Sequence, residues 1–150
     1  VDGLNINSNI QGLQKIISYI PQKIFLFESS LKNNIKLFQD ENNDLKFDEI
    51  ITKVFKNKKN FDDLSNEIKE NHTKLSGGEL KKIGIARALY KDHKILIIDE
   101  GTAGLDAEYS KYIISEILNM NKTVFFISHD LSQIKNFDVV YKIEKNKLIG

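Results

Sequence analysis

The stretch KLSGGELKKIGIARALYKDHKILIIDEGTAGLD, residues 74–106, decides the fold of this chain. Its first part predicts a helix over residues 78–91, opened by a Ser-Gly-Gly-Glu turn. Its second part contains residues 95–98 (ILII), a continuous apolar run that is typical of a strand in a parallel sheet. Two acids, Asp99 and Glu100, follow this strand directly. A helix that leads into such a strand predicts an α/β fold.

The alternation of helix and strand continues downstream of this stretch. A helix is expected over residues 107–119, and a second apolar strand over residues 123–128 that ends at His129. Because both strands are continuously apolar, we expect a parallel sheet covered by helices on both faces. The run over residues 139–143 alternates instead, which suits a strand at the edge of that sheet.

The first part of the chain is expected to supply one more strand. A helical turn over residues 10–16 leads into a β-rich run over residues 16–20, which Pro21 stops. Residues 1–7 alternate weakly and suit the end of a hairpin.

Residues 29–72 form a mostly helical block without a strand signal. Ser29 or Ser30 is expected to cap a helix that begins SLKNNI. A second helix is predicted from apolar residues that recur at helical spacing, namely Phe47, Ile50, Ile51, Val54 and Phe55. A third helix is expected over residues 61–69.

Composition and charge exclude several classes of protein. The 150 residues suffice for one domain with a core, and 22 basic and 21 acidic side chains give a net charge of +1. This balance gives no electrostatic footprint for nucleic acid. Cysteine is absent, which excludes disulfides and thiolate metal sites. No apolar run approaches the roughly 20 residues that a membrane-spanning helix needs.

Three side chains with useful chemistry lie where strands end. Ligands of open α/β sheets lie outside the carboxyl ends of the strands, where Asp99, Glu100 and His129 are expected. Adjacent strand residues point to opposite faces, so the two acids can do different work. One can hold Mg²⁺ through its water shell, while the other orients or deprotonates a water. The alternative is a strand that merely ends in acids.

The turn Ser76-Gly77-Gly78-Glu79 predicts an anion site or a helix cap. The glycines allow close approach of a ligand, and the helix N-terminus offers free N–H groups and a partial positive charge. Ser76 adds a hydroxyl donor. The same residues also fit a capping box, in which Ser76 and Glu79 seal the helix by themselves.

The order of these motifs resembles the ATP-binding cassette family, the nucleotide-binding domains of ABC transporters and their relatives. Gln22 follows a strand, LSGGE opens a helix, ILIIDE and GLD come next, and SHD ends the following strand. The resemblance covers nearly the whole chain. It implies a P-loop NTPase-like parallel sheet flanked by helices, with an inserted α-helical signature subdomain. No phosphate-binding loop with GK[ST] is present, so we expect the N-terminal part of the cassette to lie upstream.

The resemblance also divides the chain. Residues 1–28 match the Q-loop region, residues 29–91 the helical subdomain with the signature helix, and residues 92–150 the catalytic core from Walker B to the H-loop.

The resemblance implies catalytic and metal-binding roles for four residues. Asp99 matches the Walker B aspartate that supports Mg²⁺, and Glu100 matches the catalytic glutamate. His129 matches the switch histidine expected to reach the γ-phosphate of ATP. Gln22 matches the Q-loop glutamine, which contacts both Mg²⁺ and the attacking water.

Five further residues are expected to bind ATP across an interface with a second nucleotide-binding domain. Ser76, Gly77, Gly78 and Glu79 belong to the signature, in which Glu79 stands where glutamine is more usual. Asp106 falls on the D-loop, and it also suits the N-cap of the helix that begins at residue 107.

The segment YIPQKIFLFESSLKNNI, residues 19–35, resembles exporter-type cassettes. This implies a transmembrane domain, fused upstream, and a place at the cytoplasmic face of the cell membrane. The alternatives are a soluble, non-transport ATPase of the same family and a non-catalytic half that only completes a partner's site. The chain alone is expected to be inactive.

Arg87 is the only arginine, and a forked pairing with a carboxylate would explain it as well as chance does.

Overall fold

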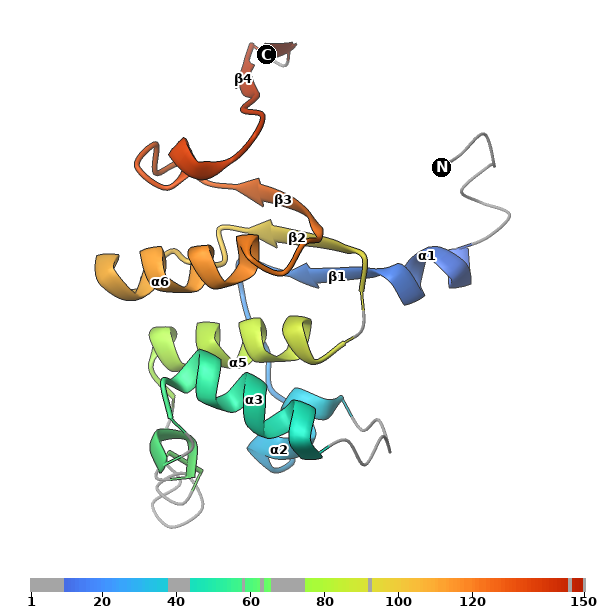
Figure 1. Ribbon diagram of the computed structural model, residues 1–150, viewed down its shortest axis with the longest axis vertical. Helices are drawn as coiled ribbons and strands as arrows, with labels where there is room; N and C mark the ends of the chain where they lie inside the picture. Colours follow the sequence, from blue (N-terminus) through green and yellow to red (C-terminus); the bar gives the residue numbers. More distant parts are fainter. Residues whose placement is uncertain are drawn as a thin grey trace.

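The computed structural model describes residues 10–37, 44–57, 59–62, 64–65, 75–91, 93–145 and 147–149. The hairpin end expected over residues 1–7 and most of the helix expected over residues 61–69 lie outside these residues. The elements, in chain order, are α1 (Ile10–Ile16), β1 (Ile17–Ile20), α2 (Leu31–Lys36), α3 (Asp44–Phe55), α5 (Gly77–Tyr90), β2 (Ile95–Asp99), α6 (Ala107–Leu118), β3 (Thr123–Ile127), the 3-10 turn η2 (Ile134–Asn136), β4 (Lys142–Glu144) and β5 (Lys147–Ile149) (Figure 1).

The three apolar runs form one parallel sheet, as the sequence predicts. Its strand order is β1-β2-β3, so the strand before Gln22 and the strand before His129 flank the strand before Glu100. In this register Ile20 pairs with Ile98, which pairs with Phe126. The carboxyl ends of all three strands therefore lie at one edge of the sheet.

Only one face of the sheet is buried among the described residues. Ile20, Leu96 and Ile98 point into the core, where they meet apolar side chains of α5 and α6. On the other face Tyr19 is exposed and Phe125 is 56% exposed. The prediction of a sheet covered on both faces is therefore wrong for these residues. The apolar runs predict burial of both faces, but the described helices pack against one of them.

The helical block packs below the sheet in Figure 1, with α2, α3 and α5 side by side. The helix predicted from apolar spacing is confirmed as α3, and all five predicted residues are buried. Their aromatic rings form an edge-to-face cluster, in which the Phe47 ring lies 5.8 Å from that of Phe61 and 6.2 Å from that of Tyr90. This cluster joins α3 to α5, the helix that carries the Ser-Gly-Gly-Glu turn.

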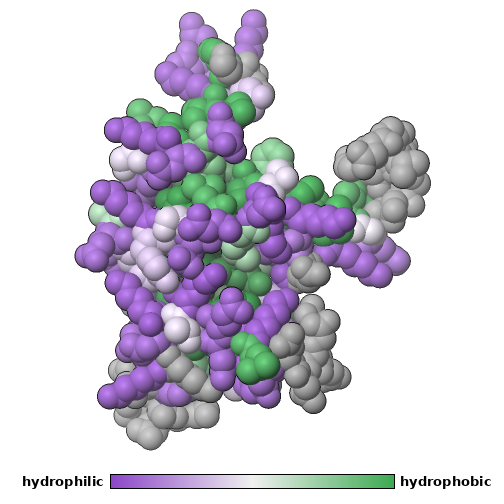
Figure 2. Space-filling model, in the orientation of Figure 1, coloured by the Kyte–Doolittle hydropathy of each residue, from purple (hydrophilic) through white to green (hydrophobic). Residues whose placement is uncertain are grey.

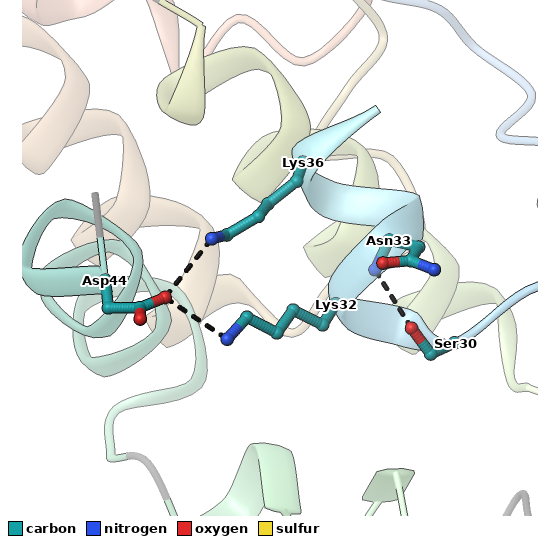
Figure 3. Close-up of polar contacts among 5 residues, drawn as sticks. All are labelled: Ser30, Lys32, Asn33, Lys36 and Asp44. Atoms are coloured by element: carbon teal, nitrogen blue, oxygen red, sulfur yellow. Dashed lines mark hydrogen bonds and ion pairs between the residues drawn. The ribbon is translucent and has the colours of Figure 1, made fainter. Parts of the chain in front are cut away.

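A polar contact joins the start of α3 to α2 (Figure 3). The Ser30 hydroxyl caps α2 by accepting a 3.1 Å hydrogen bond from the N–H of Asn33, so Ser30 is the cap rather than Ser29. Asp44, the first residue of α3, lies 3.2 Å from the ammonium groups of both Lys32 and Lys36. Their hydrogen bonds lower the pKa of Asp44.

The edge strand expected over residues 139–143 is wrong. Residues 139–141 lie outside any strand, and β4 pairs antiparallel with β5 in a separate two-stranded sheet. Alternation predicts a strand but not its partner, and the nearest partner here is the strand that follows one tight turn later.

Figure 2 shows apolar surface around β3 and the segment leading to this hairpin, where Val139, Tyr141 and Ile143 are exposed. Within the described residues, no helix has the length and apolar character to cross a membrane.

Candidate active site

The carboxyl ends of the three parallel strands bring together three of the predicted residues. Gln22 follows β1, Glu100 follows β2 and His129 follows β3. The amide Nε2 of Gln22 donates a 2.6 Å hydrogen bond to Glu100 Oε2, and His129 Nε2 lies 2.9 Å from Glu100 Oε1. Each oxygen of the Glu100 carboxylate thus has a partner from a neighbouring strand. The parallel topology brings the three strand ends to one edge of the sheet, where these side chains can meet.

The backbone of Glu100 leaves the strand in an unusual conformation. Its φ of 49° is left-handed, a region that costs a residue with a side chain roughly 1–2 kcal/mol. Its N–H still donates to the carbonyl of Ile127 at 3.0 Å, so β3 holds the residue in place. Backbone strain held by its surroundings is common at functional sites, where it fixes a side chain in one direction.

Asp99 has a different partner, on the open face of the sheet. It is the last residue of β2, and its Oδ2 accepts a 2.9 Å hydrogen bond from the hydroxyl of Tyr19. This hydrogen bond raises the pKa of Tyr19. Sequence reasoning missed Tyr19, although its place in β1, on the same face of the sheet as Asp99, was the available signal.

The oxygen atoms at this edge fit Mg²⁺ shared with a phosphate, but not a metal held by protein alone. The described residues contain no group of three or more His, Cys, Asp or Glu side chains that could hold a metal ion. Mg²⁺ binds through one or two carboxylates and completes its shell with water and substrate phosphates. The Asp99 carboxylate and the Gln22 amide oxygen are ligands of this kind.

The Ser-Gly-Gly-Glu turn forms the capping box that the sequence offered as an alternative. Ser76 Oγ accepts from the N–H of Glu79 at 3.3 Å and donates to Glu79 Oε2 at 2.7 Å. The N–H of Ser76 also donates to Glu79 Oε2, at 2.7 Å. Gly77 has open space around its Cα, and a Cβ on Gly78 would meet only Leu105, at 3.7 Å. The hydrogen bonds of the turn thus lie within α5, apart from the Glu100 cluster.

Asp106 caps α6, as one of its two predicted roles requires. Its Oδ1 accepts a 2.7 Å hydrogen bond from the N–H of Tyr109, and its side chain is exposed. A carboxylate here satisfies a helix donor and complements the helix dipole.

Lys81 belongs to the same site, and sequence reasoning missed it. This residue of α5 is 8% exposed, and its ammonium donates to the carbonyl of Gln22 at 2.6 Å and to that of Glu100 at 3.0 Å. A lysine in a helix is usually solvated. The available signal was its place one and two turns before the buried Ile85 and Ala88, on the same helix face.

Arg87 makes a forked pairing, but its acceptors are not the carboxylate that the sequence suggested. Its Nη1 donates to the carbonyl of Phe25 at 2.6 Å, while Nε and Nη2 donate to the carbonyl and side-chain oxygens of Asn34 at 2.8 and 2.7 Å. Burial lowers the pKa of Arg87. Planar carbonyl oxygens fit the guanidinium fork as a carboxylate does.

This contact holds the segment that follows Gln22. Buried Asn34 donates to the carbonyls of Phe27, Ser29 and Ser30, and its side-chain oxygen accepts from the N–H of Phe27. The backbone of residues 25–30 is therefore fixed while Phe25 stays 78% exposed.

Comparison with known proteins places this chain in a family. The family model described as ABC transporter matches residues 1–103. The β-(1→2)glucan export ATP-binding/permease protein NdvA of Bartonella bacilliformis is 35% identical over 99% of this chain and 26% of its own length. The ATP-dependent lipid A-core flippase 1 of Colwellia psychrerythraea is 34% identical over 99% of this chain. A solved bacterial Atm1-family ABC exporter with ATP bound covers 93% of this chain at a TM-score of 0.75 and 25% identity. The chain spans about a quarter of the length of these relatives.

Proposed function

Because the chain belongs to the ABC transporter family, we propose that it hydrolyses ATP as part of an exporter's nucleotide-binding domain. The site would lie at a head-to-tail interface between two such domains, and hydrolysis would drive transport across a membrane. The observation that carries this proposal is the convergence of Gln22 and His129 on the Glu100 carboxylate. Similarity to export proteins, such as the glucan export protein of Bartonella bacilliformis, supports the exporter assignment.

The reaction is in-line attack of water on the γ-phosphate, in which catalysis is mainly positioning and charge neutralisation. Glu100 acts as general base and takes the proton of the attacking water. Gln22 orients that water from the end of β1, and His129 donates a hydrogen bond to the γ-phosphate from the end of β3. Asp99 and Gln22 would hold Mg²⁺, which would supply charge neutralisation on the phosphates.

The N-terminus of α5 serves the nucleotide of the partner domain. Gly77 and Gly78 would donate hydrogen bonds to its phosphate through their backbone N–H groups, because the first N–H groups of a helix lack partners inside the helix. The Ser76 hydroxyl, which donates to Glu79 Oε2 in this structure, would turn to the phosphate. Glu79 shapes the turn, and Asp106 lies at the same interface. Residues 29–91 then act as the helical subdomain that carries this surface, between the Q-loop region (1–28) and the catalytic core (92–150).

The second partner is a transmembrane domain, fused to the cassette as in the relatives named as ATP-binding/permease proteins. The exposed apolar segment of Phe25, Leu26 and Phe27 supports this contact. It lies three residues beyond Gln22, so a shift of the segment reaches the hydrolytic site directly. The domain would work at the cytoplasmic face of the membrane.

Replacement of Glu100 by glutamine in the full-length protein tests this function. Glu100→Gln keeps the shape of the side chain but removes the base, so we expect ATP turnover to fall by about 100-fold or more. ATP binding should persist, and the ATP-bound dimer should accumulate in size-exclusion chromatography.

The matched control is Glu108→Gln, an exposed acid in the first turn of α6. This variant should hydrolyse ATP at the wild-type rate. Wild-type turnover in the Glu100→Gln variant would remove Glu100 from the mechanism, and lack of turnover in the wild-type protein would overturn the proposed function.

A further inference from the structure

The ammonium of Lys81 touches the backbone of two residues of the proposed hydrolytic site. Its Nζ donates to the carbonyl of Gln22 at 2.6 Å and to the carbonyl of Glu100 at 3.0 Å. The side chains of these two residues meet each other at 2.6 Å. One donor group therefore closes a ring that runs through both backbones and both side chains.

Both acceptors lie just beyond the ends of their strands, although the N–H of Glu100 still donates to the carbonyl of Ile127 in β3. β1 ends at Ile20 and β2 ends at Asp99, and Glu100 is left-handed. The next residue is Gly101, where a Cβ would approach Ile98 to 2.6 Å and Ile20 to 3.0 Å. The backbone here lies tightly against the two strands, so a shift of either loop changes the distance between the Gln22 and Glu100 side chains.

The environment of Lys81 explains why the charge can stay buried. Burial lowers the pKa of Lys81, and the nearby charges of Glu100 and Asp99 oppose that shift. A buried ammonium is costly unless it is hydrogen-bonded and compensated by opposite charge, and this one has both forms of compensation.

We propose that Lys81 is a positioning residue for ATP hydrolysis, which holds the loops after β1 and β2 so that Gln22 and Glu100 face the same water. This inference rests on the proposed function. Lys81 does not touch the reacting atoms, and it acts through the two carbonyls. Loss of the Lys81 ammonium would let the two loops separate while the nucleotide-binding surfaces stay in place. Small misplacements of catalytic groups lower the reaction rate strongly.

The test uses Lys81→Met and Lys81→Arg in the full-length protein. Lys81→Met keeps the apolar stem but removes the donor, so we expect kcat for ATP to fall by about 10- to 100-fold. The KM for ATP should stay within about twofold, because the change removes alignment rather than substrate contacts. Lys81→Arg keeps charged donors for both carbonyls and should restore most of kcat.

Lys82→Met is the matched control, because it removes a neighbouring ammonium that lies 4.8 Å from the Tyr109 ring centroid. It should leave kcat unchanged. If Lys81→Met does not fold, Lys81→Leu, which also removes the donor, takes its place with the same expected split between kcat and KM. Melting temperatures of all variants identify those that are merely unfolded.

The outcomes separate the two proposals. Wild-type kcat in Lys81→Met, or an equal loss in Lys81→Met and Lys81→Arg, overturns the positioning role while ATP hydrolysis by the wild-type protein still stands. A wild-type protein without ATP turnover overturns both proposals.

Discussion

Glu79 places a negative charge on the helix end proposed to receive a phosphate. Its carboxylate accepts hydrogen bonds from both the hydroxyl and the N–H of Ser76. The N-terminus of a helix attracts anions, and here the helix supplies one itself. An incoming phosphate must therefore approach against the charge of Glu79.

Glu79→Gln should strengthen ATP-dependent dimerisation. The amide oxygen can still accept from Ser76, while the charge that opposes the phosphate is gone. Charge effects at helix ends amount to about 0.3–1 kcal/mol, so we expect roughly a two- to fivefold lower ATP concentration at half-maximal dimerisation. Size-exclusion chromatography in the Glu100→Gln background measures this. Glu49→Gln, which alters an exposed acid of α3, is the control, and a higher ATP requirement in the Glu79 variant would contradict the argument.

At the residue scale, the sequence predicted side chains better than backbone contacts. Glu100 and His129 could be predicted to converge because each follows a strand of one parallel sheet, and the family resemblance added Gln22. The partners of Lys81 could not be predicted, because they are carbonyl oxygens, and every residue of the chain carries one. Arg87 shows the same limit, since its fork was anticipated but its carbonyl acceptors were not.

At the scale of elements, two tyrosines connect α6 to α3 of the helical block. The hydroxyl of buried Tyr109 donates to the carbonyl of Val54, and the hydroxyl of Tyr112 donates to the carbonyl of Lys53 at 3.1 Å. Both carbonyls lie in the last turn of α3, where a helix has no internal donors for them. Burial raises the pKa of Tyr109, so it remains a donor.

Tyr109→Phe should weaken this junction. The change leaves the Val54 carbonyl buried without that donor, and we expect a loss of about 1–2 kcal/mol in the free energy of local opening. Native-state hydrogen exchange of the α3 amides in the full-length protein measures it. Tyr141→Phe, at an exposed hydroxyl, should change nothing. Equal protection in the two variants would show that Tyr109 contributes packing alone.

Elements were predictable where local signals suffice. Caps at Ser30, Ser76 and Asp106 mark helix starts, and continuous apolar runs mark the parallel strands. The prediction of an edge strand failed because strand pairing depends on tertiary structure. Residues 142–144 pair with β5, which is close in the sequence, and not with the parallel sheet. The prediction that both faces of the sheet are covered failed for a related reason. The residue pattern of a strand does not show which segment packs on each face.

At the scale of the whole molecule, Phe25 is the most exposed residue of an apolar segment that Arg87 and Asn34 hold in a fixed shape. An apolar segment that is held in one conformation but left exposed to solvent is typical of a protein interaction surface. In the proposed exporter the partner is the transmembrane domain.

Cysteine accessibility tests this contact without knowledge of the transported substrate. The chain has no cysteine, so Phe25→Cys provides a single label site once any cysteines elsewhere in the full-length protein are replaced. Because a packed interface excludes solvent, we expect maleimide labelling at least about tenfold slower than at Leu45→Cys, where the native side chain is 87% exposed. Equal labelling rates at the two positions would exclude Phe25 from the contact.

The pairing of β1 with β2 also has a consequence for the order of folding. Gln22 and Glu100 lie 78 positions apart in the chain, whereas the contacts within α3 and α5 are local. Closing a long loop lowers the entropy of the chain before the contacts between its ends can stabilise it. Strands that lie far apart in the sequence therefore pair late. We therefore expect the helices to form first and the proposed hydrolytic site to form among the last features of the chain.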